Sequence, residues 1–569
     1  MLCPTDVSRA HLPVAIWNDR WYDIEAIFTG SATVVDGKPY IVYPGLCDKA
    51  HVGCTTYADY AIAVPSNVSD PLYTDWSKRG YENENINPIV NGTSDDPSTA
   101  WETGHGEWRL IGNGGAVGQN NHSKAPIFAA TNFEGPWKLV GDSPFTTGEC
   151  QSFFPLPGIY PGSAASSDPM PTHVHKRGHG APGCSGDCMQ MGTYVQGVPG
   201  SVGEWSQTPG VPFDEVLIDH GHYYASKDFF DPVMKRRILW GWATIPGGCQ
   251  SLPRSITYHP ELKQLVYSPI EELAGLRGKP LATLGSTPLA AGTPLELGKG
   301  WPSTAGRSAD VNISFAMPTT PTRLSVAILG GAVTAFADFV SKTNVTVGFG
   351  SLGGSEVGTA PPPANKANMS RFMPNFDLGG GDYSIEHHPP NTDPAVCQKL
   401  CDGQPKCKAW TYVIRGSPTG SGDCCLKSVV PCPRAVAGGD KMWSGAKVAG
   451  EQTCLPHSGG GGGGGVPNTL QLLSSDAELT IRVFVDNQVL EAYFMDGRVA
   501  ITAAAPGTVQ SGAVAVESTA AGKLVSAEVF PMSGIWISPE EVLAMPRPDH
   551  LQPALVAEYV PGNVSTQPL

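Results

Sequence analysis

Between Ile27 and about Arg277 the sequence consists of short apolar runs broken by glycine, proline, asparagine and aspartate. Runs of this length suit β-strands, and the residues that break them are those that form turns. The 68 glycines and 52 prolines make up about a fifth of the 569 residues, where roughly an eighth is usual. Long helical bundles and coiled coils are therefore excluded, and the pattern predicts an all-β fold such as a barrel, a sandwich or a propeller.

Several segments predict particular elements. The run 32–35, an Asp-Gly dipeptide and the run 40–43 predict a hairpin with a two-residue turn. Residues 237–242 predict a buried strand, and residues 270–276 predict a short helix. Apolar residues alternate with other residues along 479–485, which predicts a strand with one buried face.

The cysteines and glycosylation sequons indicate the secretory pathway. Seven of the 14 cysteines lie between Cys397 and Cys454, a density that predicts a small disulfide-bonded module, and the paired Cys-x2-Cys units of a zinc site are absent. We therefore expect an extracellular, cell-wall or vacuolar protein. Residues 1–4 do not begin a signal peptide, so we expect the start of the natural chain to be missing. The sequons are at Asn67, Asn91, Asn121, Asn312, Asn344, Asn368 and Asn563.

The charge pattern excludes some partners. The net charge is −15 and no basic block is present, which argues against nucleic acids and anionic membranes. We also expect no cofactor. Three histidines and two cysteines, which fall within residues 173–188, could bind a metal, but their irregular spacing favours an insertion loop. These residues are His173, His175, His179, Cys184 and Cys188.

Linker signals flank the cysteine-rich region. Three prolines at 361–363 precede it and seven glycines at 459–465 follow it. Because insertions are tolerated in loops, we predict a cysteine-rich domain inserted into a loop of a β-sandwich.

Three segments of the first half combine acidic, aromatic and small polar residues. Residues 28–33 read F-T-G-S-A-T, residues 95–101 read D-D-P-S-T-A-W, and residues 148–155 read G-E-C-Q-S-F-F-P. Taken alone, each acid would more often be a turn or solvated loop residue. Together they supply what sugar chemistry requires: a proton donor, further carboxylates and aromatic walls.

In this order the three segments resemble signatures of the family 32 glycoside hydrolases, the invertases and fructan-active enzymes. The corresponding family motifs are F-S-G-S-A-T, R-D-P-T-T-A-W and W-E-C-P-D-F-F-P. Residues 224–227 and 236–242 also resemble the family's F-Y-A-S-K and R-R-I-L-W-G-W. The resemblance implies a five-bladed β-propeller, its first blade incomplete here, followed by a β-sandwich.

The cysteine-rich region resembles an apple/PAN-type module in its Cys397-x3-Cys401-x5-Cys407 spacing and in residues 409–412. Such modules bind proteins or carbohydrates, and a disulfide-held spacer is the alternative. The resulting domains are a propeller at 1–277, a sandwich at 278–360 and 466–540, the insert at 370–456, and a tail at 541–569.

The family resemblance also implies site residues. Glu149 matches the general acid/base of a retaining mechanism, and Asp96 matches the stabiliser of the transition state. Asp95 stands where the family has arginine, which reverses a charge beside Asp96. The residues expected to bind substrate are Phe28, Ser31, Asp95, Trp101 and Cys150.

The nucleophile of the family is the aspartate of a W-M-N-D-P-N-G motif, and no N-D-P-N-G occurs in this sequence. Asp19 lies too close to Phe28 to take that position. We therefore predict a β-fructofuranosidase-type glycosidase for sucrose or fructans that is impaired in this chain. The alternative is a non-catalytic carbohydrate-binding or adhesion protein that retains the pocket.

Overall fold

The structure, a computed structural model, describes residues 12–534 with gaps. Strands dominate the described part, which also contains one α-helix, α1 (Ala395–Gly403), and three 3-10 helices, η1 (Glu271–Leu276), η2 (Leu329–Gly331) and η3 (Met495–Gly497). None of these helices is long and apolar enough to cross a membrane. The positions left out between 12 and 534 are 13, 55–57, 94–95, 114–123, 147, 165–167, 179–185, 209–215, 299, 303, 352–353, 358–364, 370–372, 375, 378–381, 389–392, 406, 415–421, 428–433, 436–441, 449, 455–468, 488, 507–508 and 510.

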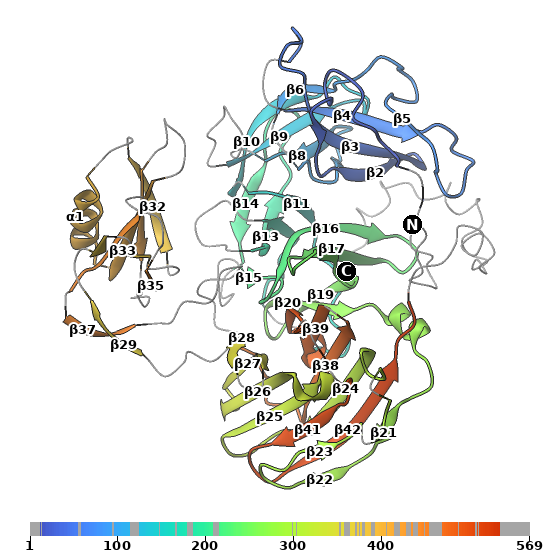
Figure 1. Cartoon of the computed structure of the whole chain (residues 1–569). Helices are drawn as coiled ribbons and strands as arrows, with labels where there is room; N and C mark the ends of the chain where they lie inside the picture. The colour runs from blue at the N-terminus through green and yellow to red at the C-terminus, as the bar shows by residue number, and fades with distance from the viewer. Residues whose placement is uncertain are drawn as a thin grey trace.

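Four antiparallel sheets follow one another in the first half of the chain, in the upper part of Figure 1. The first contains β1 (Ala26–Ile27), β2 (Ser31–Val35), β3 (Lys38–Leu46), β4 (Ala58–Pro65), β5 (Trp76–Ser77) and β6 (Val90–Thr93). The second contains β7 (Trp101–Glu102), β8 (Trp108–Ile111), β9 (Lys124–Ala130) and β10 (Lys138–Thr146). The third contains β11 (Ser152–Pro155), β12 (His173–Arg177), β13 (Cys188–Val195), β14 (Glu204–Gln207) and β15 (Val216–Leu217). The fourth contains β16 (Tyr223–Asp231), β17 (Arg236–Ala243), β18 (Cys249–Gln250), β19 (Arg254–His259) and β20 (Gln264–Pro269).

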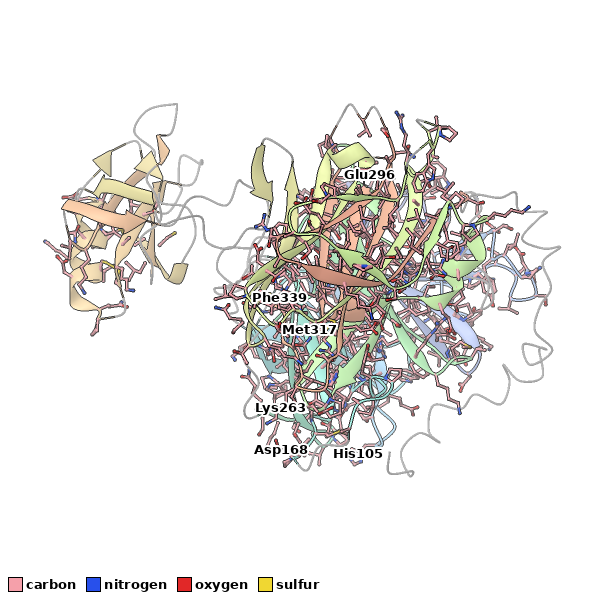
Figure 2. All side chains as sticks on the ribbon, turned by 90° about the horizontal axis from the view of Figure 1, so that it is seen from below. His105, Asp168, Lys263, Glu296, Met317 and Phe339 are labelled. Atoms are coloured by element: carbon pink, nitrogen blue, oxygen red, sulfur yellow. A yellow bond between two sulfur atoms is a disulfide. The ribbon has the colours of Figure 1, made fainter. Side chains whose placement is uncertain are left out.

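Consecutive sheets pack face to face through shared apolar cores, which is the arrangement of propeller blades. The three cores lie around Tyr60 and Phe128, around Phe145 and Phe153, and around Val174 and Leu239. The predicted propeller is confirmed, and four sheets are what the described residues contribute to it. On its surface, Lys263 pairs with Asp168 at 2.8 Å, and the two labelled side chains lie close together in Figure 2.

Local sequence patterns account for individual elements. In the predicted hairpin, β2 pairs with β3 from Val35 and Lys38 outward, and the turn residues Asp36 and Gly37 have φ values of 49° and 76°. Positive φ at both positions is the conformation that favours an Asp-Gly turn. The predicted strand at 237–242 lies within β17, and the predicted helix at 270–276 is η1.

Two further sheets form the sandwich at the bottom of Figure 1. One contains β21 (Ala282–Leu284), β22 (Thr287–Leu289), β24 (Ser308–Ala316), β38 (Glu478–Asp486), β39 (Val489–Phe494), β40 (Val499–Ala504) and β42 (Gly522–Pro531). The other contains β23 (Leu295–Glu296), β25 (Thr322–Ile328), β26 (Val333–Ser341), β27 (Asn344–Ser351), β28 (Gly354–Val357) and β41 (Ala515–Ser518). The alternation predicted along 479–485 is confirmed, because Leu479, Ile481 and Val483 enter the core between the sheets.

The cysteine-rich module lies in the chain between β28 and β38, two strands that both belong to the sandwich. In Figure 1 the module stands apart from the sandwich. Its entry and exit strands, β29 (Asn365–Met369) and β37 (Gly450–Cys454), pair with each other. This pairing brings the two ends of the module together, as an insertion into a loop requires. The predicted domain boundaries themselves stay predictions.

Within the module α1 lies beside a five-stranded sheet. Disulfides join Cys397 to Cys424 and Cys401 to Cys407, and the fully buried Trp410 and Tyr412 form the core. The module's strands also include β30 (Met373–Pro374), β31 (Phe376–Asp377), β32 (Asp382–His388), β33 (Ala409–Ile414), β34 (Gly422–Lys427), β35 (Arg434–Ala435) and β36 (Met442–Ala446).

A buried polar network joins the propeller to the sandwich. The guanidinium of Arg254 in β19 pairs with Asp219 at 2.8 Å and with Glu491 of β39 at 2.7 Å. It also donates hydrogen bonds to the hydroxyls of Tyr493 at 3.0 Å and Thr502 at 2.9 Å. The side chains of Arg254 and Asp219 are fully buried, and an apolar cluster that includes Ile238 and Phe484 joins the same two parts, so the network contributes to their relative placement.

Candidate active site

Strands β2, β7, β11 and β16 lie at the edges of the four propeller sheets, and the predicted site residues lie on or just before them. Ser31 begins β2, Asp96 precedes β7, and Glu149 and Cys150 precede β11. Lys227 belongs to β16. Contacts among these residues place the four sheet edges next to one another.

Lys227 contacts segments of three other sheets. Its Nζ donates to the carbonyl oxygen of Pro97 at 2.9 Å, to Oγ of Ser31 at 3.1 Å and to the carbonyl oxygen of Gln151 at 3.4 Å. Oγ of Ser31 in turn donates to the same Pro97 carbonyl at 2.6 Å. The three predicted motifs therefore meet around one ammonium group.

Asp96 is buried and has a φ of 57°, in the left-handed region that aspartate tolerates better than most residues. Its Oδ2 accepts a hydrogen bond from the backbone N–H of Cys150 at 3.0 Å. Because Glu149 immediately precedes Cys150, this bond ties together the two segments that carry the predicted catalytic acids.

Glu149 is partly buried and is hydrogen-bonded by a tyrosine from another sheet. The hydroxyl of Tyr224 in β16 donates to its Oε2, and the N–H of Gly178 donates to its carbonyl oxygen at 2.6 Å. Burial and the bond to Glu149 raise the pKa of Tyr224. The phenol therefore stays protonated, and it remains a donor to the Glu149 carboxyl group at neutral pH.

Cys150 is buried beside Asp96, and burial raises the pKa of its thiol to about 12. At neutral pH it is a protonated thiol and a poor nucleophile.

We expect Cys150 to resist alkylation by iodoacetamide in the native protein at pH 8, because the thiolate is the reactive species and is scarce far below its pKa. Peptide mass spectrometry would quantify the labelling. The protein unfolded in guanidinium chloride serves as the control, in which Cys150 should be labelled within minutes. Equally rapid labelling of the native protein would contradict the buried, protonated thiol.

The other predicted substrate-binding residues are placed differently. Phe28 is 41% exposed. Trp101 packs against Phe153 of the third sheet, with ring centroids 5.2 Å apart, and its Nε1 donates to Gln196 at 3.3 Å. Asp95 lies outside the described residues.

Sequence reasoning missed buried charged residues that contact the backbone of the site segments. Lys176 of β12 donates to the carbonyl oxygen of Cys150 at 2.8 Å and pairs with Asp187 at 3.4 Å. Asp187 also accepts a hydrogen bond from the N–H of Ser226 at 2.6 Å, and the Lys176 and Asp187 side chains are fully buried. The likeness of residues 224–227 to F-Y-A-S-K was a signal for Lys227, but it assigned that residue no role.

Asp19, the acid considered for the nucleophile position, lies on the surface. Its side chain is 61% exposed and pairs with Nζ of Lys78 at 2.8 Å. The hydrogen bond from Lys78 lowers the pKa of Asp19.

The prediction of an insertion loop is wrong for His173 and His175, because both lie in β12, which pairs with β13. Their rings stack on Phe153 and Phe145, with centroids 5.0 Å and 4.4 Å apart. Burial lowers the pKa of His173 to about 4 and that of His175 to about 3, so both are neutral at pH 7. Cys188 is in a disulfide, and His179 and Cys184 lie outside the described residues.

Comparisons with known proteins agree with this architecture. Residues 7–269 match the glycosyl hydrolases family 32 N-terminal domain, residues 450–531 match the glycosyl hydrolases family 32 C terminal, and residues 376–427 match the PAN domain.

Among curated proteins, the chain is 35% identical over 301 residues to an insoluble beta-fructofuranosidase isoenzyme, CWINV2, of Arabidopsis thaliana, covering 47% of each chain. It is 32% identical over 296 residues to the acid beta-fructofuranosidase of Solanum lycopersicum, covering 47% of this chain and 43% of that protein. The alignments thus span about half the length of these relatives.

Solved structures support the fold. Fructan 1-exohydrolase IIa from Cichorium intybus superposes with a TM-score of 0.55 at 20% identity, covering 94% of this chain and 89% of that one. Exo-inulinase from Aspergillus awamori superposes with a TM-score of 0.52 at 13% identity, covering 90% and 84%. With both domain matches on the propeller and the sandwich, the chain belongs to glycosyl hydrolase family 32 and carries a PAN domain as an insert.

Proposed function

We propose that this protein is a glycosidase of the β-fructofuranosidase type, acting on sucrose or fructans with retention of configuration. The observation that carries the proposal is the hydrogen bond from the N–H of Cys150 to Oδ2 of Asp96, at 3.0 Å, which joins the segments bearing the two acids. Relatives named beta-fructofuranosidases and structural neighbours named fructan 1-exohydrolase and exo-inulinase support the same substrate class.

In this proposal Glu149 protonates the leaving oxygen, and Tyr224 holds the Glu149 carboxyl group in place through its hydrogen bond. Asp96 accepts hydrogen bonds from hydroxyls of the fructosyl ring, which strengthen as positive charge develops on that ring. In the same proposal the remaining predicted substrate-binding residues that the structure describes, Phe28, Ser31, Trp101 and Cys150, belong to the pocket. Disulfides of the described residues, among them Cys47–Cys54 and the two of the module, support a secretory route.

A second candidate is a carbohydrate-binding protein without catalysis, favoured by the absence of N-D-P-N-G from the 569 residues. The PAN insert would then supply a further protein or carbohydrate contact. The two candidates differ in one measurement: fructose release from sucrose that depends on Glu149 identifies the glycosidase, whereas sugar binding without such release identifies the binding protein.

Replacing Asp96 with asparagine is expected to weaken fructose binding by about 10-fold or more, because hydrogen bonds to a charged group contribute about 1.5–3 kcal/mol. Asparagine also tolerates the left-handed backbone at this position, so the fold should be retained. Fructose titration followed by tryptophan fluorescence or calorimetry gives the affinity.

Asp168→Asn is the matched control, because Asp168 is a surface aspartate whose side chain is 57% exposed. It should bind fructose as the unmodified protein does. Equal affinity for Asp96→Asn and the unmodified protein would remove Asp96 from the site.

A further inference from the structure

We propose that Lys227 is a positioning residue whose ammonium group sets the segments carrying Ser31, Asp96 and Glu149 in their mutual arrangement. What that arrangement does with a sugar rests on the proposed function. The positioning itself rests on the contacts of Lys227 alone.

The three donors of an ammonium group match the three acceptors around Lys227. The acceptors are the hydroxyl of Ser31 in the first sheet, the carbonyl of Pro97 beside Asp96, and the carbonyl of Gln151 two residues after Glu149. With all three donors engaged by the protein, Lys227 has none left for a substrate. It therefore acts through the neighbouring segments and does not contact the sugar.

The hydrogen bonds of Lys227 give it a role that requires a charged donor. Lys227 is partly buried, where charge-assisted hydrogen bonds are stronger than in water. Burial lowers the pKa of Lys227 and the nearby charge of Lys176 adds to this shift, whereas the carboxylates of Asp96 and Asp228 partly oppose it. A neutral side chain of similar length would fill the space but would remove one donor from each of the three acceptors, and among the described residues only the Pro97 carbonyl has a second donor, the Ser31 hydroxyl.

Hydrogen exchange at the N–H of Cys150 reports this positioning, because that N–H donates to Asp96 and so joins the segment of Glu149 to the segment of Asp96. In Lys227→Met we expect hydrogen exchange at Cys150 to accelerate by about 10-fold or more. Exchange in β24, at the centre of the sandwich, should not change. Hydrogen exchange of the full chain, read by mass spectrometry or NMR, measures both without any sugar.

Two further variants separate positioning from general destabilisation. Lys138→Met removes an exposed lysine of β10 and should leave Cys150 exchange unchanged. Lys227→Arg retains a cation with several donors and should restore much of the protection. If Lys227→Met does not fold, Lys227→Gln is measured in its place, and the same local acceleration is expected.

Unchanged exchange at Cys150 in the folded variant, or equal acceleration in β24, would overturn the positioning role. If exchange accelerates locally but the unmodified protein binds no fructose, the positioning role stands and the proposed function fails.

Discussion

Replacing Arg254 with methionine is expected to cost about 3–5 kcal/mol of stability, the usual penalty for removing one partner of a buried ion pair. Arg254 is the only cation in the described network that joins the propeller to the sandwich, and it pairs with Asp219 and Glu491. Methionine fills part of the space, but both carboxylates would remain buried without a counter-charge. The loss should appear as a decrease in Tm of about 6–20 °C.

Calorimetry is the preferred measurement, because a protein of several domains need not unfold in a single step. We expect the transitions of the propeller and the sandwich to separate, since Arg254 holds them together through Glu491 and Tyr493.

Arg79→Met is the matched control, because Arg79 pairs with Glu84 at 2.7 Å on the surface, where both side chains are exposed. Such surface pairs contribute about 0–1 kcal/mol, so the control should barely change Tm. If Arg254→Met shifts Tm no more than Arg79→Met, the network does not hold the two parts together.

The sequence was sufficient for elements whose signal is local. The Asp-Gly turn between β2 and β3 requires positive φ at both residues, and this requirement is visible in the dipeptide itself. The strand β38 was visible because a half-buried strand alternates apolar and polar residues. The family motifs likewise located Asp96 and Glu149, whose segments the structure brings together.

The residues that the sequence did not reveal depend on distant partners. Lysine is rarely buried, so nothing in the sequence indicated that Lys176 contacts the site, and the likeness to F-Y-A-S-K gave Lys227 no role. Lys227 is 196 positions from Ser31 and 130 from Pro97, and only the meeting of sheet edges joins them. In the same way, 237 positions separate Arg254 from Glu491.

The chain of 569 residues is expected to release fructose from sucrose more slowly than about 0.01 per second, against a typical enzyme turnover of about 10 per second. The reason is that N-D-P-N-G, which carries the family's nucleophile, is absent from the sequence. Without a nucleophile the covalent fructosyl intermediate cannot form on the protein, although the segments of Glu149 and Asp96 are hydrogen-bonded to each other.

Formate should restore part of this activity, because it supplies a small carboxylate in place of the nucleophile that the sequence lacks. In this reaction formate attacks the anomeric carbon of the fructosyl group, the bond to the glucosyl oxygen breaks, and Glu149 donates its proton to that oxygen. Water then hydrolyses the fructosyl formate. We expect fructose release to increase by about 10-fold or more in molar formate, and we expect Glu149→Gln to remove most of that increase, since a general acid contributes about 10²–10⁴-fold.

The three outcomes lead to different conclusions about the molecule. Turnover near 1 per second or above without formate would mean that another acid of the chain serves as the nucleophile. A response to formate that depends on Glu149 supports a glycosidase site that is complete except for its nucleophile. Fructose binding with neither basal release nor a formate response supports the carbohydrate-binding protein, because Glu149 would then be present in the pocket but unable to donate its proton to the leaving oxygen.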